Sequence, residues 1–236
     1  TQLSADTPSE KLQKVLARAG LGSRREMERR IEAGEVEVDG RRAQLGDRVE
    51  SSARIKLAGR PVTPAALEPS PRRVIVYHKP LGELVTRRDP EGRKTVFTRL
   101  PRIKGARWIA IGRLDINTSG LLLLTTDGEL ANRLMHPRYQ LLRDYAVRIY
   151  GRLYQTLIEA LTRGVDLDDG RARFESVMPL DTGRAANEWY RVRLREGRNR
   201  LVRRLFEAHS LQVSRLMRVQ YGPVELPAGM REGHFD

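Results

Sequence analysis

Cysteine is absent from this 236-residue chain, which excludes a disulfide framework, a thiol nucleophile and a cysteine-ligated zinc site. Histidine is scarce, and the four histidines are scattered without the spacing of metal ligands. Any chemistry must therefore come from carboxylates, hydroxyls, histidine or arginine.

Long apolar runs are also lacking, because no stretch approaches the roughly 20 residues that span a bilayer. Residues Thr1 to Glu10 do not show the basic-then-apolar order of a signal peptide. We therefore expect a soluble, cytoplasmic protein that does not bind a membrane.

Negative charge is in short supply, since 30 Asp and Glu face 44 Lys and Arg, for a formal net charge of +14. Such a surplus favours a polyanionic partner, because neutralised phosphates release their counterions. Nucleic acid is the leading partner class, ahead of an anionic membrane surface. Because 38 of the 44 cations are Arg, a codon-biased genome is an alternative source of part of this composition.

The length allows one catalytic domain and a small accessory module. Near the N-terminus, apolar residues recur at helical spacing and predict a first helix of about ten residues from Lys11 to Gly20. Ser23 and Glu26 form a capping-box signature, which predicts a second helix that ends by Gly34.

Short strands are predicted next. Residues Glu35 to Asp39 alternate between apolar and polar, Asp39-Gly40 predicts a hairpin turn, and Arg54 to Leu57 alternates again. The module is therefore two helices followed by short strands.

Five cations lie off the apolar stripe of the two predicted helices and would make one face strongly basic. An ordinary solvated face is the alternative. We predict that these residues contact RNA: Lys14, Arg18, Arg24, Arg25 and Arg29.

The segment Lys11 to Leu57 resembles the S4 RNA-binding domain through the run LQKVLARAGLGSRREMERRIEAGEVEVDG. The resemblance implies a module that docks on structured RNA. Arg60 to Pro71 carries four prolines and no periodic apolar pattern, which indicates an extended linker. We place the S4 domain at residues 10–60, the linker at 61–71 and a catalytic domain at 72–236.

Helices and strands are mixed in the remainder of the chain. Helices are expected from Asp127 and over Leu201 to Ala208, and strands over Val74 to Tyr77, Trp108 to Ile111, Leu121 to Leu124, Tyr145 to Tyr150 and Trp189 to Leu194. We predict an α+β fold, with helices flanking a mixed, mostly antiparallel sheet.

Asp115 lies in the segment from Gly112 to Gly120, between two predicted strands. A tight loop of this kind presents a side chain into a cleft. On the residues alone, an Asp that caps a turn is the favoured alternative.

The run GRLDINTSGLLLLTTDGELANRLMHP, from Gly112 to Pro137, resembles the central motif of the pseudouridine synthases, in the ribosomal-RNA branch with an N-terminal S4 domain. Three further runs agree in order: HKPLGELVT, LRDYAVRIYG and EGRNRLVRRLFEA. The resemblance covers nearly the whole chain and is strongest to members acting on large-subunit RNA. It implies isomerisation of a uridine without metal or organic cofactor.

The resemblance assigns roles to individual residues. Asp115 would be the essential ionised carboxylate, through attack at C1′, attack at the base or abstraction of a ribose proton. Arg203 would pair with it, and Arg200 and Arg204 are the alternative registers. Tyr145 would stack on the target base, although a core Tyr is the alternative on spacing alone.

Further roles concern RNA contact. Arg113 would fill the gap left by the flipped uridine. Arg198 and Arg200 are predicted RNA contacts. Lys79-Pro80 and Gly82 are better explained as a structural turn near the cleft, with Lys79 as a possible phosphate contact. Asp127 is better explained as a helix N-cap than as the second carboxylate of a glycosidase.

Two other classes of function remain open. The chain could be an S4-type RNA-binding factor for ribosome assembly with incidental catalysis. A glycosidase would need a second placed carboxylate, and another phosphate-binding enzyme a Gly-rich loop, and we find neither. The expected partner is ribosomal RNA of the large subunit or its assembly intermediate, bound by a monomer.

Overall fold

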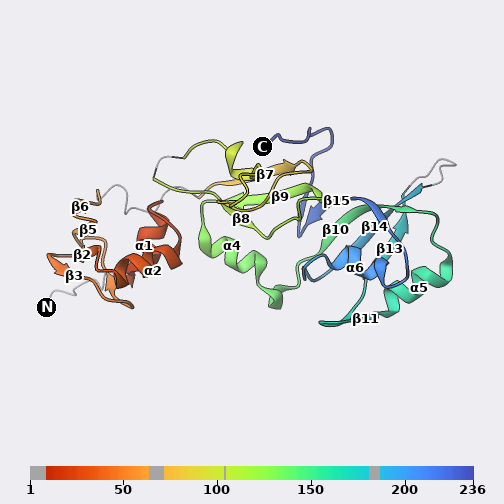
Figure 1. The fold of residues 1–236 in the computed structure, drawn as a ribbon, viewed down its shortest axis with the longest axis horizontal. Helices are drawn as coiled ribbons and strands as arrows, with labels where there is room; N and C mark the ends of the chain where they lie inside the picture. Colours follow the sequence, from red (N-terminus) through yellow and green to blue (C-terminus); the bar gives the residue numbers. More distant parts are fainter. Residues whose placement is uncertain (1–8, 64–71, 104, 181–186) are drawn as a thin grey trace, which may run out of the picture. The chain divides into compact units, whose positions relative to one another are not determined.

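The computed structural model describes residues 9–63, 72–103, 105–180 and 187–236. The chain divides into two compact units (Figure 1). The first unit holds residues 1–73, 101–109 and 126–128, and the second holds residues 74–100, 110–125 and 129–236. Most of the predicted linker, residues 64–71, lies outside the described residues, so its extended form stays a prediction.

The first unit contains two short helices, α1 (Leu12–Arg18) and α2 (Arg24–Glu32). The predicted capping box is confirmed: the Ser23 hydroxyl accepts from the Glu26 amide at 3.0 Å, and the Glu26 carboxylate accepts from the Ser23 amide at 3.4 Å. Because the box satisfies two amides with no partner inside the helix, it fixes where α2 begins.

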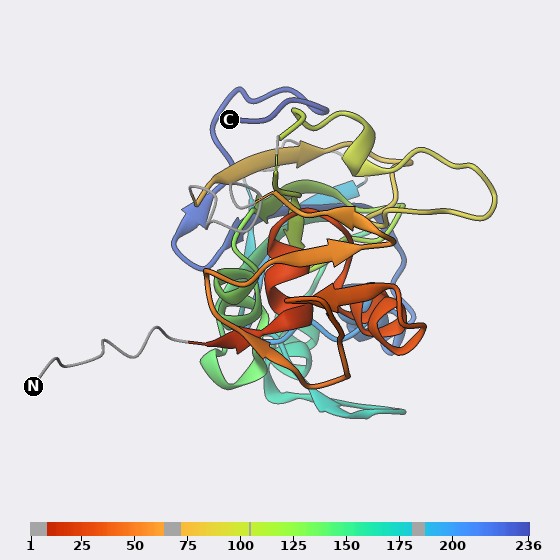
Figure 2. The ribbon, with the colours of Figure 1, turned by 90° about the vertical axis from the view of Figure 1, so that its left-hand side faces the viewer.

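Short strands complete this unit (Figure 2). Asp39 and Gly40 both have positive φ, 50° and 82°, as the predicted tight hairpin turn requires. The apolar face of the helices packs on the strands around a core that includes Leu12, Leu16 and Met27. One pair is β1 (Glu10–Lys11) with β4 (Arg48–Val49), and a sheet runs in the order β3 (Arg41–Arg42), β2 (Val36–Val38), β5 (Ile55–Leu57), β6 (Arg60–Pro61).

A large mixed sheet organises the second unit. Its order is β13 (Ser176–Pro179), β14 (Asn187–Leu194), β10 (Arg143–Tyr150), β15 (Val213–Tyr221), β9 (Ser119–Thr125), β7 (Val74–Lys79), with β16 (Val224–Glu225) on β15 and β8 (Ile109–Ile111) on β9. Strand β9 runs parallel to β15, whereas β13, β14, β10 and β15 pair antiparallel in succession, as β9 does with β7. The predicted α+β fold is confirmed.

Strand β9 lies inside the sheet, and every residue of its sequence SGLLLLT is buried. A continuous apolar run of this length is typical of a strand covered on both faces. It begins directly after the loop that carries Asp115 and so gives that loop a rigid support.

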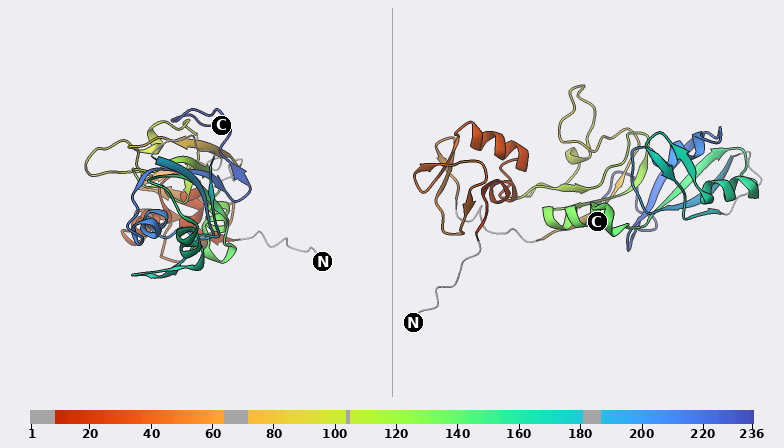
Figure 3. Two further views of the ribbon diagram at one scale, coloured as in Figure 1. Left: turned by 90° about the vertical axis from the view of Figure 1, so that its right-hand side faces the viewer. Right: turned by 90° about the horizontal axis from the view of Figure 1, so that it is seen from below.

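Helices and smaller elements surround this sheet. Helix α4 (Gly128–Met135) follows β9, and the 3₁₀ turns are η1 (Val96–Thr98) and η2 (Pro137–Tyr139). Helices α5 (Gln155–Arg163) and α6 (Leu201–Glu207) lie at the end of the sheet near β13 and β14, together with the hairpin β11 (Val165–Leu167) and β12 (Gly170–Ala172) (Figures 1 and 3). Among the described residues, no helix is long and apolar enough to cross a membrane.

Candidate active site

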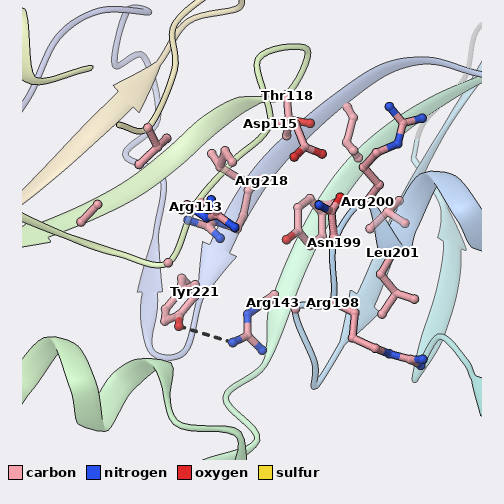
Figure 4. A pocket seen from close by; sticks show the side chains of 18 of the residues that line it. Arg113, Asp115, Thr118, Arg143, Arg198, Asn199, Arg200, Leu201, Arg218 and Tyr221 are labelled. Atoms are coloured by element: carbon pink, nitrogen blue, oxygen red, sulfur yellow. Dashed lines mark hydrogen bonds between the residues drawn. The ribbon is translucent and has the colours of Figure 1, made fainter. Parts of the chain in front are cut away.

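Asp115 lies on the loop between β8 and β9. The Thr118 amide donates to the Asp115 carbonyl at 3.0 Å, which closes a turn, while Gly112 enters the loop with φ of 77°. The Asp115 side chain is exposed and faces a cleft of about 980 Å³ (Figure 4). Asp115 is therefore presented to a ligand, even though its backbone also belongs to a turn.

Residues from both predicted and unpredicted positions line this cleft. Four of the predicted site residues, Arg113, Tyr145, Arg198 and Arg200, line it together with Asp115. Figure 4 shows Arg113, Arg218 and Tyr221 on one side of the cleft and Asn199 and Arg200 on the other, with Asp115 at the top between them. Arg203 does not line the cleft but reaches the loop by another contact.

The Lys79 side chain supports the loop that carries Asp115. Its fully buried ammonium donates to the Thr118 carbonyl at 2.8 Å and to the Pro80 carbonyl at 3.0 Å. Burial lowers the pKa of Lys79 to about 8, and the negative charges of Glu83 and Asp115 oppose that decrease. The possible phosphate contact proposed for Lys79 is wrong, because a fully buried ammonium with carbonyl partners is not available to RNA.

The buried Lys79 predicts a pH dependence of stability. Its pKa is about 8 in the folded protein and has an ordinary value of 10.5, so the unfolded chain binds more protons between these values. Stability should therefore rise with pH across this window, by at most about 1.4 kcal/mol per pH unit. Urea unfolding from pH 7 to pH 10.5 should show this rise in the wild type and its loss in Lys79→Met. Lys56→Met, at an exposed lysine, is the control, and equal slopes in Lys79→Met and wild type would contradict the assignment.

Arg203 differs from its predicted contact. Its Nη2 donates to the carbonyl of Asn117 at 2.8 Å and its Nη1 to the carbonyl of Val213 at 3.2 Å, and among the described residues it forms no ion pair with Asp115. Burial lowers the pKa of Arg203, and the Asp115 charge works against that shift, so the two charges interact through space. The Arg203 guanidinium is therefore bound to the backbone of the Asp115 loop, at a position two residues after Asp115.

Tyr145 lies in β10, where its Cα is opposite Val192 on one side and Arg218 on the other. Its side chain is only 8% exposed, yet it lines the cleft. Both interpretations from the sequence therefore apply: the ring packs in the sheet and forms part of the cleft wall.

Arg198 was predicted to contact RNA, but its donors serve the protein. It forms ion pairs with Asp169 at 2.8 Å and with Glu196 at 2.7 Å, and it donates to the carbonyls of Gly170 and Arg171, both at 3.0 Å. Two carboxylates neutralise its charge, so Arg198 mainly anchors the β11–β12 turn.

Two neighbours of Arg198 differ in their exposure to a ligand. Arg204 also pairs with Asp169. Arg200 is exposed and pairs with Glu207 through its Nη2 at 3.3 Å, which leaves its other donors accessible for RNA.

In the first unit, the cations of the predicted basic face differ between the two helices in whether a carboxylate pairs with them. Lys14 and Arg18 both pair with Glu10, at 3.1 Å and 2.8 Å, so their charges are partly compensated. The cations on α2 are exposed and keep the character predicted for an RNA contact: Arg24, Arg25 and Arg29.

Sequence reasoning missed the residues at the floor of the cleft. Arg218 and Arg143 each place a guanidinium carbon 4.9 Å from the ring centroid of Tyr221, and the Tyr221 hydroxyl donates to the Leu134 carbonyl at 2.8 Å. Cation–π contacts of this kind hold planar groups in fixed positions. The sequence signal for Arg218 was a single Arg in the mostly apolar run LMRVQY, and the many other arginines of the chain obscured it.

A second cleft of about 1,000 Å³ adjoins the first, since residues such as Arg143 and Arg198 line both. Its lining contains six arginines and two glutamates: Arg143, Arg163, Arg171, Arg173, Arg195 and Arg198, with Glu175 and Glu196. Such a surplus of positive charge attracts phosphates.

The acidic residues and histidines were compared with the needs of a metal site and of a second catalytic carboxylate. Within the described parts of the chain, no group of three or more His, Asp or Glu could hold a metal ion. Asp127, the candidate second carboxylate, pairs with Arg72 at 2.7 Å just before α4 and lines neither cleft.

Comparison with known proteins adds independent information. Residues 73–208 match the profile of a family described as RNA pseudouridylate synthase, and residues 10–55 match the S4 domain. Two proteins named ribosomal large subunit pseudouridine synthase B, from Salmonella typhimurium and Escherichia coli K12, are each 57% identical over 227 residues, which cover 95% of this chain and 78% of theirs. A solved pseudouridylate synthase shares the fold, with a TM-score of 0.64 at 21% identity over 96% of this chain and 94% of that one.

Proposed function

This chain belongs to the RNA pseudouridylate synthase family, and on that premise we propose that it converts one uridine of large-subunit ribosomal RNA to pseudouridine. The observation that carries the proposal is the cleft that exposed Asp115 and buried Tyr145 line together with several arginines. Relatives with 57% identity that are named for the large subunit support the choice of RNA.

The reaction needs a carboxylate and a place to hold a detached base. The bond between N1 of the uracil and C1′ of the ribose breaks, the base turns, and C5 bonds to C1′. The hydrogen of C5 leaves as a proton and N1 gains one, so no electrons are exchanged with a cofactor. We assign the carboxylate to Asp115, whose exposed position lets it reach the ribose of a uridine in the cleft.

Access to the uridine requires base flipping, because its reacting atoms are hidden within a stacked strand. Arg113 is exposed beside Asp115 on the cleft rim and is suited to occupy the vacated stack. Tyr145, in the wall, is suited to stack on the flipped base. Arg203 would orient Asp115 through the Asn117 carbonyl, and catalytic contacts of this kind often tighten only when substrate binds.

The S4 domain, residues 10–60 in our assignment, would hold the RNA while residues 72–236 act on it. Its exposed cations Arg24, Arg25 and Arg29 are the proposed contacts. Lys14 and Arg18 would contribute less, because Glu10 compensates both. We further propose that the protein acts as a cytoplasmic monomer.

The direct test is pseudouridine formation by the purified protein. RNA labelled with tritium at C5 of uridine releases the label when C5 bonds to C1′. We expect release from large-subunit RNA, naked or partly assembled, and none from small-subunit RNA. If every assembly state of the large-subunit RNA keeps its label, the proposal is wrong.

The second cleft should bind the RNA backbone beside the target. Three of its arginines are exposed, Arg163, Arg171 and Arg173, and the ion pairs of Arg171 with Asp166 and of Arg173 with Glu175 are long, at 3.5 Å and 3.6 Å. Replacing all three with Gln should weaken RNA binding and make the slope of log Kd against log salt shallower by about 2 to 3, because each lost phosphate contact removes 0.7 to 0.9.

Binding titrations between 50 and 300 mM salt measure that slope. Arg152→Gln is the matched control, because Arg152 is exposed and lines neither cleft. The rate at saturating RNA should stay near that of the wild type. An unchanged slope in the triple variant would show that the RNA takes another path.

A further inference from the structure

We propose that Arg218 is the cation that stabilises the uracil while it is detached from the ribose. The inference rests on the proposed function and names a residue that the sequence did not indicate. Arg218 lies in β15, lines the cleft and is 2% exposed, so its guanidinium is a buried charge at the reaction site.

The strand register places Arg218 directly beside Tyr145. Asp144 pairs with Gln220, but the next residue, Tyr145, pairs with Arg218, so Val219 is an extra residue in β15. A bulge of this type redirects side chains and is common next to active sites. The bulge therefore sets a guanidinium opposite the residue proposed to stack on the base.

The contacts of Arg218 fix its position but leave its charge uncompensated. Its Nε donates to the Leu121 carbonyl at 2.8 Å, and its plane lies near the Tyr221 ring, at 4.9 Å. Its Nη2 is buried and has no hydrogen-bond partner. In the part of the chain that the structure describes, Arg218 forms no ion pair with a carboxylate, and its interacting neighbours are Tyr145, Tyr221 and Arg143; an unpaired buried charge is costly to keep without a function.

The reaction supplies the missing negative charge. When the N1–C1′ bond breaks, its electron pair stays on the uracil and spreads over N1, O2 and O4. The pair is returned when C5 bonds to C1′, C5 then loses its proton and N1 is protonated. Asp115 cannot stabilise this anion, because its own charge is negative.

Arg218 is better suited to this task than the exposed cations of the cleft. Arg113 and Arg200 are exposed to water, which screens their charges. A fixed cation in a buried position interacts with developing charge far more strongly. Arg218 also remains protonated despite a pKa lowered by burial, as guanidinium groups do in proteins.

Chemical rescue tests the proposal. In single-turnover reactions with large-subunit RNA, Arg218→Ala should slow pseudouridine formation by about 100- to 1,000-fold, as loss of a buried stabilising donor does, with little change in RNA binding. Millimolar guanidinium should restore part of the rate, whereas urea, which has a similar shape but no charge, should not. Equal rescue by both, or by neither, would overturn the electrostatic role.

The leaving group provides an independent measurement. Fluorine at C5 stabilises the uracil anion by itself, so cleavage of 5-fluorouridine RNA should depend less on Arg218. We expect the ratio of wild-type to Arg218→Ala cleavage rates to be about tenfold smaller than for uridine. Equal ratios for the two substrates would contradict the proposal.

Controls separate this inference from a structural role and from the proposed function. Arg215→Ala removes an exposed arginine of the same strand that lines neither cleft, and it should behave as wild type. If Arg218→Ala does not fold, Arg218→Met keeps the length of the side chain for the same measurements. A wild type without activity defeats the proposed function, whereas an active wild type matched by the variant defeats only this inference.

Discussion

Asp115→Asn is expected to abolish pseudouridine formation and to leave folding and RNA binding intact. The substitution keeps the size of an exposed side chain on a loop that is held by backbone contacts to Thr118 and Ile116, so the cleft should keep its shape. It removes the negative charge that meets the ribose. Loss of such a group lowers the rate by about 10³- to 10⁴-fold or more. Tritium release under single-turnover conditions measures the loss.

The matched control is Asp166→Asn, at an aspartate whose side chain is 83% exposed and lines neither cleft. It should retain full activity. Complementation in cells lacking the gene then separates the enzyme from an S4-type assembly factor. Asp115→Asn should restore ribosome assembly without the modification if binding alone supports assembly. Activity within tenfold of wild type in Asp115→Asn would remove Asp115 from the catalytic role.

Gly120→Ala is expected to cause the largest loss of stability of any single methyl addition near the site. Gly120 has φ of 104°, and a Cβ there would lie 2.2 Å from the carbonyl oxygen and 2.7 Å from the amide nitrogen of Arg218. Both obstacles are backbone atoms of the paired strand β15 and cannot rotate away. Backbone strain and overpacking together should lower the free energy of unfolding by about 3 to 5 kcal/mol.

Gly92→Ala is the control, because Gly92 also has positive φ, at 70°, but an added Cβ would meet nothing within 4 Å. It isolates the conformational strain, which is about 1 to 2 kcal/mol. Urea unfolding of both variants gives the difference. If the two variants lose equal stability, close packing of β9 on β15 is not what requires glycine at position 120.

Local patterns in the sequence predicted the features that depend on neighbouring residues. The capping box of α2, the turn at Asp39-Gly40 and the buried strand β9 all follow from short-range rules, and the structure confirms them. The position of Asp115 between two strands was predictable for the same reason. Its chemical role came only from the resemblance to a family.

Features set by distant parts of the chain were not predictable. The ion pair of Arg198 with Asp169 and the hydrogen bond of Arg203 to Asn117 depend on where α6 lies, which no local rule specifies. Helix α5 was missed because it begins without a side-chain cap, so its start carries no capping signal. Strand β15 contains a bulge at Val219, which disturbs the alternation on which strand prediction relies.

The parallel pairing of β9 with β15 also affects when the cleft can form during translation. Met217 pairs with Ser119 and Arg218 with Gly120, which joins the strand after Asp115 to one synthesised about a hundred residues later. Contacts between such distant residues form slowly, because closing the intervening chain costs entropy. During translation, a nascent chain carries Asp115 long before β15 emerges from the ribosome. The wall of the cleft is then missing, so we expect the enzyme to stay inactive until β15 has been synthesised and has paired with β9.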